Sequence, residues 1–190
     1  MDSATLNNPA LISATGLSPW GNETIDAEWY AVHVKSRHEF VVQDDLLRKR
    51  QMVFSPAVQK LSQWKDRQKL IRFPLFPGYL FVQVRSSPCA FLDILKTRGV
   101  VAFVSLQPGT PTPILREEIE ALKLMIASGK EIDIYPSLRE GTRVRMKNGP
   151  LKHAEGIITK RENHYLFVIN IELLGRSLSV KLSARDIEAL

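Results

Sequence analysis

The sequence is poor in the features that mark membrane, secreted and disulfide-bonded proteins. It contains one cysteine, Cys89, in 190 residues, which excludes an internal disulfide and favours a reducing compartment. No run of about 18 uncharged apolar residues exists, so a membrane-spanning helix is not expected. The first 28 residues contain no Lys or Arg and therefore lack the positive start of a secretory signal. We expect a cytoplasmic protein with no membrane partner.

Enzymatic signatures are also missing. There is no GxGxxG, no P-loop and no GxSxG, and the histidines have neither metal-ligand spacing nor cysteine companions. Cys89 lies near the start of an expected helix, where a thiolate would be favoured, but a small buried side chain is the preferred interpretation. We therefore expect no catalytic residue, no metal and no cofactor. The four histidines are His33, His38, His153 and His164.

Charge is distributed unevenly along the chain. The net charge is +6 in total and −4 over residues 1–28, so residues 29–190 carry +10. A basic balance of this kind favours an anionic partner, most often a nucleic acid, although solvated lysines would also account for it. Residues 1–28 are rich in Ser, Thr, Asn, Gly and Pro without periodicity, and we expect a disordered or loosely docked leader.

Residues 29–129 alternate between strand and helix patterns and predict one domain. Ser87, Pro88 and Gly99 are typical of a helix with a serine N-cap, a proline at its first position and a glycine after its end. The segment 114–129 places Leu115, Ile119, Leu122 and Ile126 on one apolar face. A long hairpin with a polar, basic tip is expected between these elements, near Lys65. The fold class is α+β, with an N-terminal α/β sandwich built on a four-stranded, mainly antiparallel sheet.

Residues 130–137 are predicted to be a linker, and 138–190 a second domain. Short β-prone runs there recur about every 10 residues, which is typical of a small barrel. We expect five strands in an SH3-like arrangement. The stretch EGTRVRMKNGPLKHAEGII, residues 140–158, combines a basic strand, an Asn-Gly-Pro turn and Gly156 before an apolar strand. This stretch resembles the KOW motif of ribosomal proteins and transcription elongation factors.

Three further stretches, WYAV, PLFPGYLFV and TRGVVAFV, occur in the order and spacing of the NusG N-terminal (NGN) domain. Over residues 29–190 the chain thus resembles a NusG-family transcription elongation factor. Within that family, its sequence is more similar to specialised paralogues of the RfaH and UpxY type. In this family, aromatics of the sheet form a pocket that grips the clamp helices of the RNA polymerase β′ subunit. The resemblance assigns polymerase contact to His33, Phe76, Tyr79, Phe81, Ser86 and Arg98, with Ser86 facing the β subunit.

Strand alternation supports part of that assignment independently. Leu80 and Val82 should face the helices, while Tyr79 and Phe81 share the other face with Phe76 nearby. From the residues alone, coverage of these aromatics by another part of the domain is equally compatible. The resemblance implies that they are uncovered.

The resemblance implies two other contacts. Lys35 and Arg37 resemble positions that face the non-template DNA strand. Apart from the resemblance, the basic hairpin residues Lys65, Arg67 and Lys69 could add phosphate contacts, and a solvated basic tip is equally compatible with them. In the KOW domain, the loop carrying Leu173, Leu174 and Arg176 matches the site for a small-subunit ribosomal protein or for Rho. The dileucine could instead close the interface with the first domain.

These expectations define a monomeric, non-enzymatic transcription elongation and antitermination factor that suppresses pausing or termination. The competing hypothesis is an RNA-binding accessory protein of ribosome assembly, which would use the KOW barrel on rRNA and show steep salt dependence.

Overall fold

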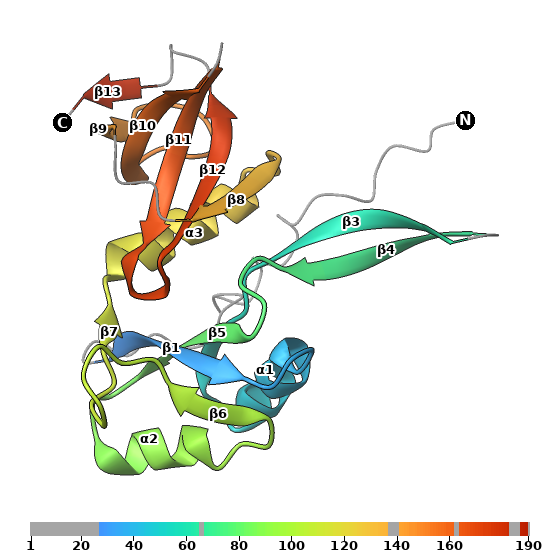
Figure 1. Ribbon diagram of the computed structural model, residues 1–190, viewed down its shortest axis with the longest axis vertical. Helices are drawn as coiled ribbons and strands as arrows, with labels where there is room; N and C mark the ends of the chain where they lie inside the picture. The colour runs from blue at the N-terminus through green and yellow to red at the C-terminus, as the bar shows by residue number, and fades with distance from the viewer. Residues whose placement is uncertain (1–26, 65–66, 137–140, 162–163, 183–186, 190) are drawn as a thin grey trace.

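The computed structural model describes residues 27–64, 67–136, 141–161, 164–182 and 187–189. A first sheet with two covering helices occupies the lower part of the molecule in Figure 1, and a second, strongly curved sheet occupies the upper part. Within the described residues, no helix is long and apolar enough to cross a membrane. The elements of the first part are β1 (Glu28–Val34), α1 (Glu39–Arg48), β2 (Met52–Phe54), β3 (Ala57–Trp64), β4 (Arg67–Pro74), β5 (Tyr79–Val84), α2 (Pro88–Leu95), β6 (Val100–Phe103), β7 (Pro113–Ile114) and α3 (Arg116–Ala127).

The first sheet has the strand order β2-β5-β1-β6, and all of these pairs are antiparallel. It differs from the expected four strands because β7 also pairs with β1, through Trp29 with Ile114 and Tyr30 with Pro113. The sequence GTPTP, residues 109–113, predicts a turn-rich break instead. Two residues suffice to add a strand here because the β1 edge beyond the end of β6 is free to accept backbone hydrogen bonds.

The two later helices of this part follow their sequence signals. Ser87 caps α2, and its hydroxyl oxygen accepts a hydrogen bond from the Ala90 backbone N–H at 3.3 Å, as the sequence predicts. In α3 the prediction is wrong for Leu115, which precedes the helix as its N-cap and is 66% exposed. The buried face of α3 carries the predicted Ile119 and Leu122 together with Met125, and the predicted Ile126 is partly buried against the same cluster.

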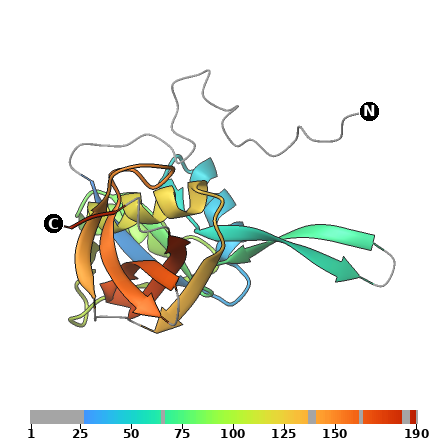
Figure 2. The same ribbon diagram turned by 90° about the horizontal axis from the view of Figure 1, so that it is seen from above.

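Strands β3 and β4 form a separate two-stranded ribbon in register from Ala57 with Pro74 to Trp64 with Arg67. Figure 2 shows this ribbon projecting well away from the rest of the molecule. The predicted projecting hairpin is therefore present. Lys65, at its predicted tip, lies outside the described residues.

The second part forms a sheet of six strands in the order β13-β9-β10-β11-β12-β8. The additional strand, β8, comes from the segment predicted to be a linker and pairs with β12 from Ile132 with Val180 to Pro136 with Arg176. Gly156 permits close packing within this sheet, since an added Cβ would lie 2.5 Å from the Val168 carbonyl oxygen. In the described residues the strand path is open, and a closed five-stranded SH3-like barrel stays a prediction. The strands are β8 (Ile132–Pro136), β9 (Thr142–Met146), β10 (Glu155–Arg161), β11 (His164–Ile171), β12 (Arg176–Leu182) and β13 (Ile187–Ala189), with the 3-10 helix η2 (Glu172–Leu174) before β12.

Helix α3 lies between the two sheets (Figure 1). One apolar cluster runs from Trp29 and Phe81 of the first sheet, through Leu122 of α3, to Phe167 and Val180 of the second sheet. A second cluster is confined to the opposite face of the first sheet, under α1 and α2. The two parts of the chain therefore share a core across α3.

Candidate partner-binding and nucleic-acid interface

Strand β5 divides its side chains between these two clusters. Leu80, Val82 and Val84 pack with Val42 of α1 and Ile94 of α2. Phe81 points to the other face and belongs to the cluster shared with α3 and the second sheet. This distribution agrees with the predicted alternation of β5.

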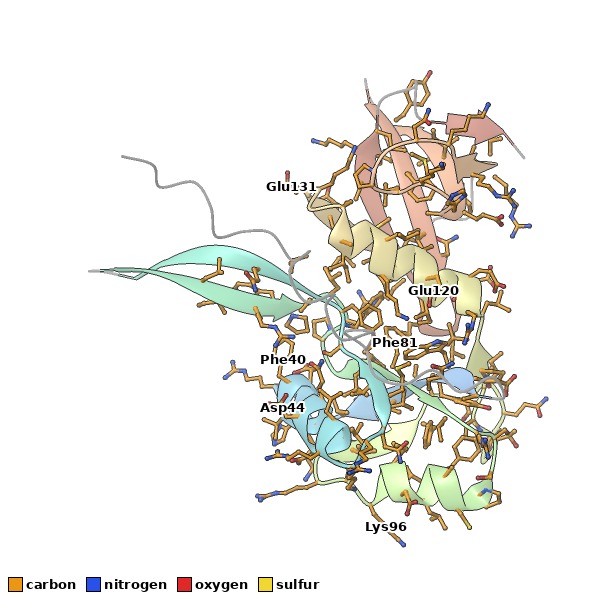
Figure 3. The ribbon with its side chains drawn as sticks, turned by 180° about the vertical axis from the view of Figure 1, so that it is seen from behind. Phe40, Asp44, Phe81, Lys96, Glu120 and Glu131 are labelled. Atoms are coloured by element: carbon orange, nitrogen blue, oxygen red, sulfur yellow. The ribbon has the colours of Figure 1, made fainter. Side chains whose placement is uncertain are left out.

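Phe76 and Phe81 are not exposed, contrary to what the resemblance implied. Their exposed fractions are 3% and 0%. The Phe81 ring meets Phe76 edge to face at a centroid distance of 5.5 Å and lies 6.2 Å from the Phe54 ring. Figure 3 shows Phe81 among the side chains that gather between α3 and the first sheet. The physical reason is the apolar face of α3, whose Ile119, Leu122 and Met125 join the same cluster and remove these rings from water.

His33 and Tyr79 form the solvent-facing rim of this aromatic group. They are Cα partners on β1 and β5, and their rings lie 5.3 Å apart with an interplanar angle of 32°. His33 is exposed and Tyr79 is half-buried against the shared cluster. Of the predicted aromatic pocket, this ring pair is the part that a partner can reach directly in this arrangement.

The rim is held in place by the turn before β5. Gly78 adopts φ of +83°, a conformation that glycine accepts without steric cost. Its N–H donates to Oε1 of Glu39 at 2.7 Å, and its carbonyl accepts from the Val34 N–H at 2.8 Å. Glu39 is only 4% exposed and was missed from the sequence, because a glutamate in the first turn of a helix predicts a solvated, dipole-complementing group.

Ser86 is exposed just before α2 and interacts with the Tyr30 hydroxyl. That hydroxyl donates to Oε2 of Glu28 at 2.8 Å. Burial raises the pKa of Tyr30 above its ordinary value, and the hydrogen bond with Ser86 opposes the shift. A partner approaching Ser86 would therefore meet a small polar group that is already hydrogen-bonded within the protein.

The predicted basic residues Lys35, Arg37 and Arg98 come from two loops at one edge of the first sheet. The Lys35 N–H donates to the Gly99 carbonyl at 2.8 Å, which joins the β1–α1 loop to the α2–β6 loop. Lys35, Arg37 and Arg98 are all exposed. Arg37 has φ of +61°, which is uncommon for a residue with a side chain. Three residues that the resemblance had divided between DNA and polymerase thus belong to one basic edge.

An aromatic group near the hairpin was missed by the sequence analysis. Arg72 of β4 lies over the Phe40 ring of α1, with Cζ 4.2 Å from the ring centroid. Phe73 next to it is 42% exposed and Leu70 is 52% exposed. Figure 3 shows Phe40 on α1. The pair could not be inferred from the sequence. Periodicity predicts the ribbon and the helix as separate elements and does not predict how they are placed relative to one another.

For the predicted DNA-binding residue Arg67, only the backbone is described, as a partner of Trp64.

In the second part, Leu173 and Leu174 lie in η2 and are half-buried against the shared cluster. Arg176 begins β12 and is exposed. The turn between them is closed by Gly175, with φ of +58°. The open alternative, in which the dileucine closes the interface with the first part, agrees with this packing.

The structure also places the single thiol and the possible metal ligands. Cys89 is exposed, so the interpretation as a buried core residue is wrong. It occupies the second position of α2, and the side of the helix that packs on the sheet carries Ile94 instead. Across the described ranges, no group of three or more His, Cys, Asp or Glu side chains is placed to hold a metal ion.

Comparisons with known proteins find relatives over most of the chain. Residues 27–123 match the family model described as "Transcription termination factor nusG". The transcription termination/antitermination protein NusG of Borreliella burgdorferi is 28% identical over 180 residues, covering 85% of this chain and 98% of its own. NusG of Staphylococcus aureus is 30% identical over 175 residues, covering 85% of this chain and 95% of its own.

Among solved structures, one titled "Domain interaction in Thermotoga maritima NusG" covers 86% of this chain and 97% of its own at 23% identity and a TM-score of 0.49. The family-model match and the S. aureus relative carry the assignment by themselves. The class is that of transcription termination and antitermination proteins. Within this class, the chain belongs to the NusG family.

Proposed function

We propose that this protein acts in the cytoplasm as a non-enzymatic elongation and antitermination factor that binds RNA polymerase. Residues 29–129 form the polymerase-binding NGN-like domain and 138–190 a KOW domain, joined across 130–137. The first domain grips the clamp helices of the β′ subunit and favours the closed clamp over the open, paused one. Such a shift requires tighter binding to the closed state. The rRNA-binding alternative is not favoured, because the chain belongs to a family of transcription proteins.

The observation that carries this proposal is the His33–Tyr79 ring pair beside the basic edge. It offers an apolar, aromatic contact at the border of a buried aromatic cluster, next to the exposed cations Lys35 and Arg37. We assign the first contact with the clamp helices to these rings. Phe76 and Phe81 join it only after the shared cluster opens, since both are buried in the closed arrangement.

The test uses Tyr79→Ala and His33→Ala in the full chain, with retention on immobilised core polymerase as the measurement. Burying an aromatic at an interface contributes about 1.5–3 kcal/mol, so Tyr79→Ala should weaken binding by about tenfold or more. Leu92→Ala is the matched control, because Leu92 is 50% exposed on α2, away from this face. Circular dichroism checks folding. If both rim variants bind as tightly as the Leu92→Ala control, the rim assignment is wrong.

The basic edge is assigned to the non-template DNA strand. Lys35, Arg37 and Arg98 are exposed and lie on loops joined by a backbone hydrogen bond. Replacing Lys35 and Arg37 by Ala should lower the salt dependence of single-stranded DNA binding by about 0.7 for each phosphate that is no longer neutralised. Arg143→Ala together with Lys152→Ala, in the second part, serves as the charge-matched control. An unchanged slope in the Lys35 and Arg37 variant would remove this assignment.

The loop carrying Leu173, Leu174 and Arg176 is proposed to bind a ribosomal protein of the small subunit or Rho. Arg176 is accessible, whereas the two leucines are half-buried against the shared cluster. Binding through the leucines therefore requires η2 to leave that cluster.

Ser86 is assigned a contact with the β subunit of the polymerase on the strength of its exposed position before α2.

A further inference from the structure

Helix α1 begins with an acidic residue whose side chain bonds to a distant turn. His38 is the N-cap of this helix and makes no side-chain capping hydrogen bond. Glu39 is the acidic residue of the first turn, a position where a carboxyl group usually complements the unpaired N–H groups at a helix start. Its Oε1 atom accepts the Gly78 N–H at 2.7 Å, across 39 positions of the chain. Glu39 therefore makes a contact outside its own helix.

The burial of Glu39 is costly for the fold. The other buried residues of α1 are Val42 and Leu46, both apolar, and Glu39 lies among them with an exposed fraction of 4%. A polar group removed from water costs free energy unless a hydrogen bond compensates for it, and here the Gly78 N–H supplies one. Departures of this kind from the usual apolar pattern are expected at functional sites.

Gly78 links this carboxyl group to both rings of the rim. A Cβ added to Gly78 would lie 3.8 Å from Cδ2 of His33, and Tyr79 follows it directly in the chain. The Gly78 carbonyl accepts from the Val34 N–H at 2.8 Å, and the Tyr79 N–H donates to the Phe76 carbonyl at 2.9 Å. Because Gly78 is bonded to the end of β1 and begins the path into β5, a shift of this residue moves the two rings relative to each other.

We propose that Glu39 is a positioning residue for the polymerase contact, whose carboxyl group fixes the Gly78 turn and thereby the arrangement of the His33 and Tyr79 rings. The inference rests on the proposed function, since it takes these rings as the surface that meets the polymerase. Glu39 acts through Gly78, because its own side chain is buried. Without this acceptor, the Gly78 N–H loses its partner and the turn leaves the position in which the ring centroids lie 5.3 Å apart.

Three variants separate the reach of the side chain from its acidity. Glu39→Gln keeps the length and an acceptor oxygen but removes the acidic group. Glu39→Asp keeps the acidic group but is one methylene shorter, so it cannot reach Gly78 without a shift. Glu39→Ala removes both. A positioning role therefore predicts that the Gln variant resembles the unaltered chain and that the Asp variant resembles the Ala variant.

The first measurement is made by NMR on the full chain without polymerase. It records the nuclear Overhauser effects between the His33 and Tyr79 ring protons and the hydrogen-exchange rate of the Gly78 amide. In Glu39→Asp and Glu39→Ala, we expect weaker ring effects and exchange at Gly78 that is faster by about tenfold. In Glu39→Gln, both signals should stay close to those of the unaltered chain.

The second measurement is retention on immobilised core polymerase. Glu39→Asp and Glu39→Ala should weaken binding by about five- to tenfold, whereas Glu39→Gln should rescue it to within about twofold. Asp44→Ala is the matched control, since it removes a carboxyl group from an exposed position of the same helix (Figure 3). This control should leave the ring signals, the Gly78 exchange rate and the retention unchanged.

The proposal is overturned if Glu39→Asp keeps the ring signals and the Gly78 exchange rate of the unaltered chain, or if Glu39→Gln disturbs them as strongly as Glu39→Asp. Should Glu39→Ala fail to fold, the Gln and Asp variants decide. A Gly78 amide that exchanges at the rate of an unprotected amide in the unaltered chain would also overturn it. Unchanged retention in a variant that has lost its ring signals would instead contradict the proposed function and leave the positioning role of Glu39 intact.

Discussion

The two faces of the first sheet are both apolar, but they bury their side chains in different ways. The face under α1 and α2 is closed by residues between Tyr30 and Phe103, all from the first part of the chain. The face toward α3 continues into the second sheet, as far as Val180. The first face is therefore a local core that the first part completes by itself. The second face depends on α3 and on a sheet whose first strand, β8, begins 98 positions after the end of β1.

The sharpest way to break this comparison is to truncate neighbouring residues of β5. Phe81 and Leu80 are both 0% exposed, but they point to opposite faces. Phe81→Ala should lower the free energy of unfolding by about 3–5 kcal/mol and Leu80→Ala by about 2–5 kcal/mol, measured by chemical denaturation. Only Phe81→Ala should also speed hydrogen exchange in β10 and β11, because it alone removes a ring from the shared cluster.

The ratio of the two exchange effects decides the interpretation. Equal exchange in β10 and β11 for both variants would mean that the sheet faces are not energetically distinct. If Phe81→Ala does not fold, Phe81→Leu keeps most of the apolar volume and should show the same difference with a smaller cost.

The same contrast explains what the sequence could predict. On the local side, Ser87 and Pro88 marked the start of α2, because caps depend on neighbouring residues only. The end of α2 was placed too late, since its C-cap is Lys96 and Gly99 lies three residues further on. The alternation of β5 was also correct. On the face toward α3, the apolar pattern of α3 was visible in the sequence. Such a pattern predicts that one face of the helix is buried, but it does not predict which residues cover that face. The residues therefore left open whether Phe76 and Phe81 are covered, and the expectation that they are uncovered came from the family resemblance.

Strand β8 fails to appear in the prediction for a related reason. The segment 130–137 has charged residues and a proline, which indicate a linker when considered locally. It becomes a strand because β12 offers an unpaired edge and five residues of backbone can satisfy it. The Glu39 and Arg72 contacts are of the same kind, since each joins residues more than 30 positions apart.

A second prediction concerns two glycines with left-handed backbones. Gly99 has φ of +97°, and an added Cβ would lie 2.8 Å from Cγ2 of Val42, in the core under α1. Gly109 has φ of +81° with nothing within 4 Å. Both alanine variants carry backbone strain of about 1–3 kcal/mol. Gly99→Ala should cost about 1–2 kcal/mol more because it also overpacks the core. Equal losses in denaturation midpoints would show that α1 yields at this contact.

A third prediction addresses the start of α2. Ser87→Ala removes the side-chain oxygen that accepts the Ala90 N–H, so it should lower the free energy of unfolding by about 1 kcal/mol. Ser86→Ala, one position earlier, is the control. It removes the hydrogen bond with the Tyr30 hydroxyl, but that hydroxyl keeps Glu28 as a partner and Ser86 is exposed, so unfolding should change by less. The same pair separates stability from binding: in the proposed function, Ser86→Ala weakens polymerase retention and Ser87→Ala does not. A reversed pattern would exchange the roles of the two serines.

The smallest expected effect lies at the root of the hairpin. Arg72 is exposed and its guanidinium covers the Phe40 ring, an arrangement that contributes about 0.5–1 kcal/mol at such sites. Arg72→Lys keeps the charge but loses the planar stacking, whereas Arg72→Ala loses both. A double-mutant cycle with Phe40→Leu isolates the contact between the two side chains. A coupling near zero would mean that the ribbon is held only by its backbone continuity with β2 and β5, and that α1 does not set its direction.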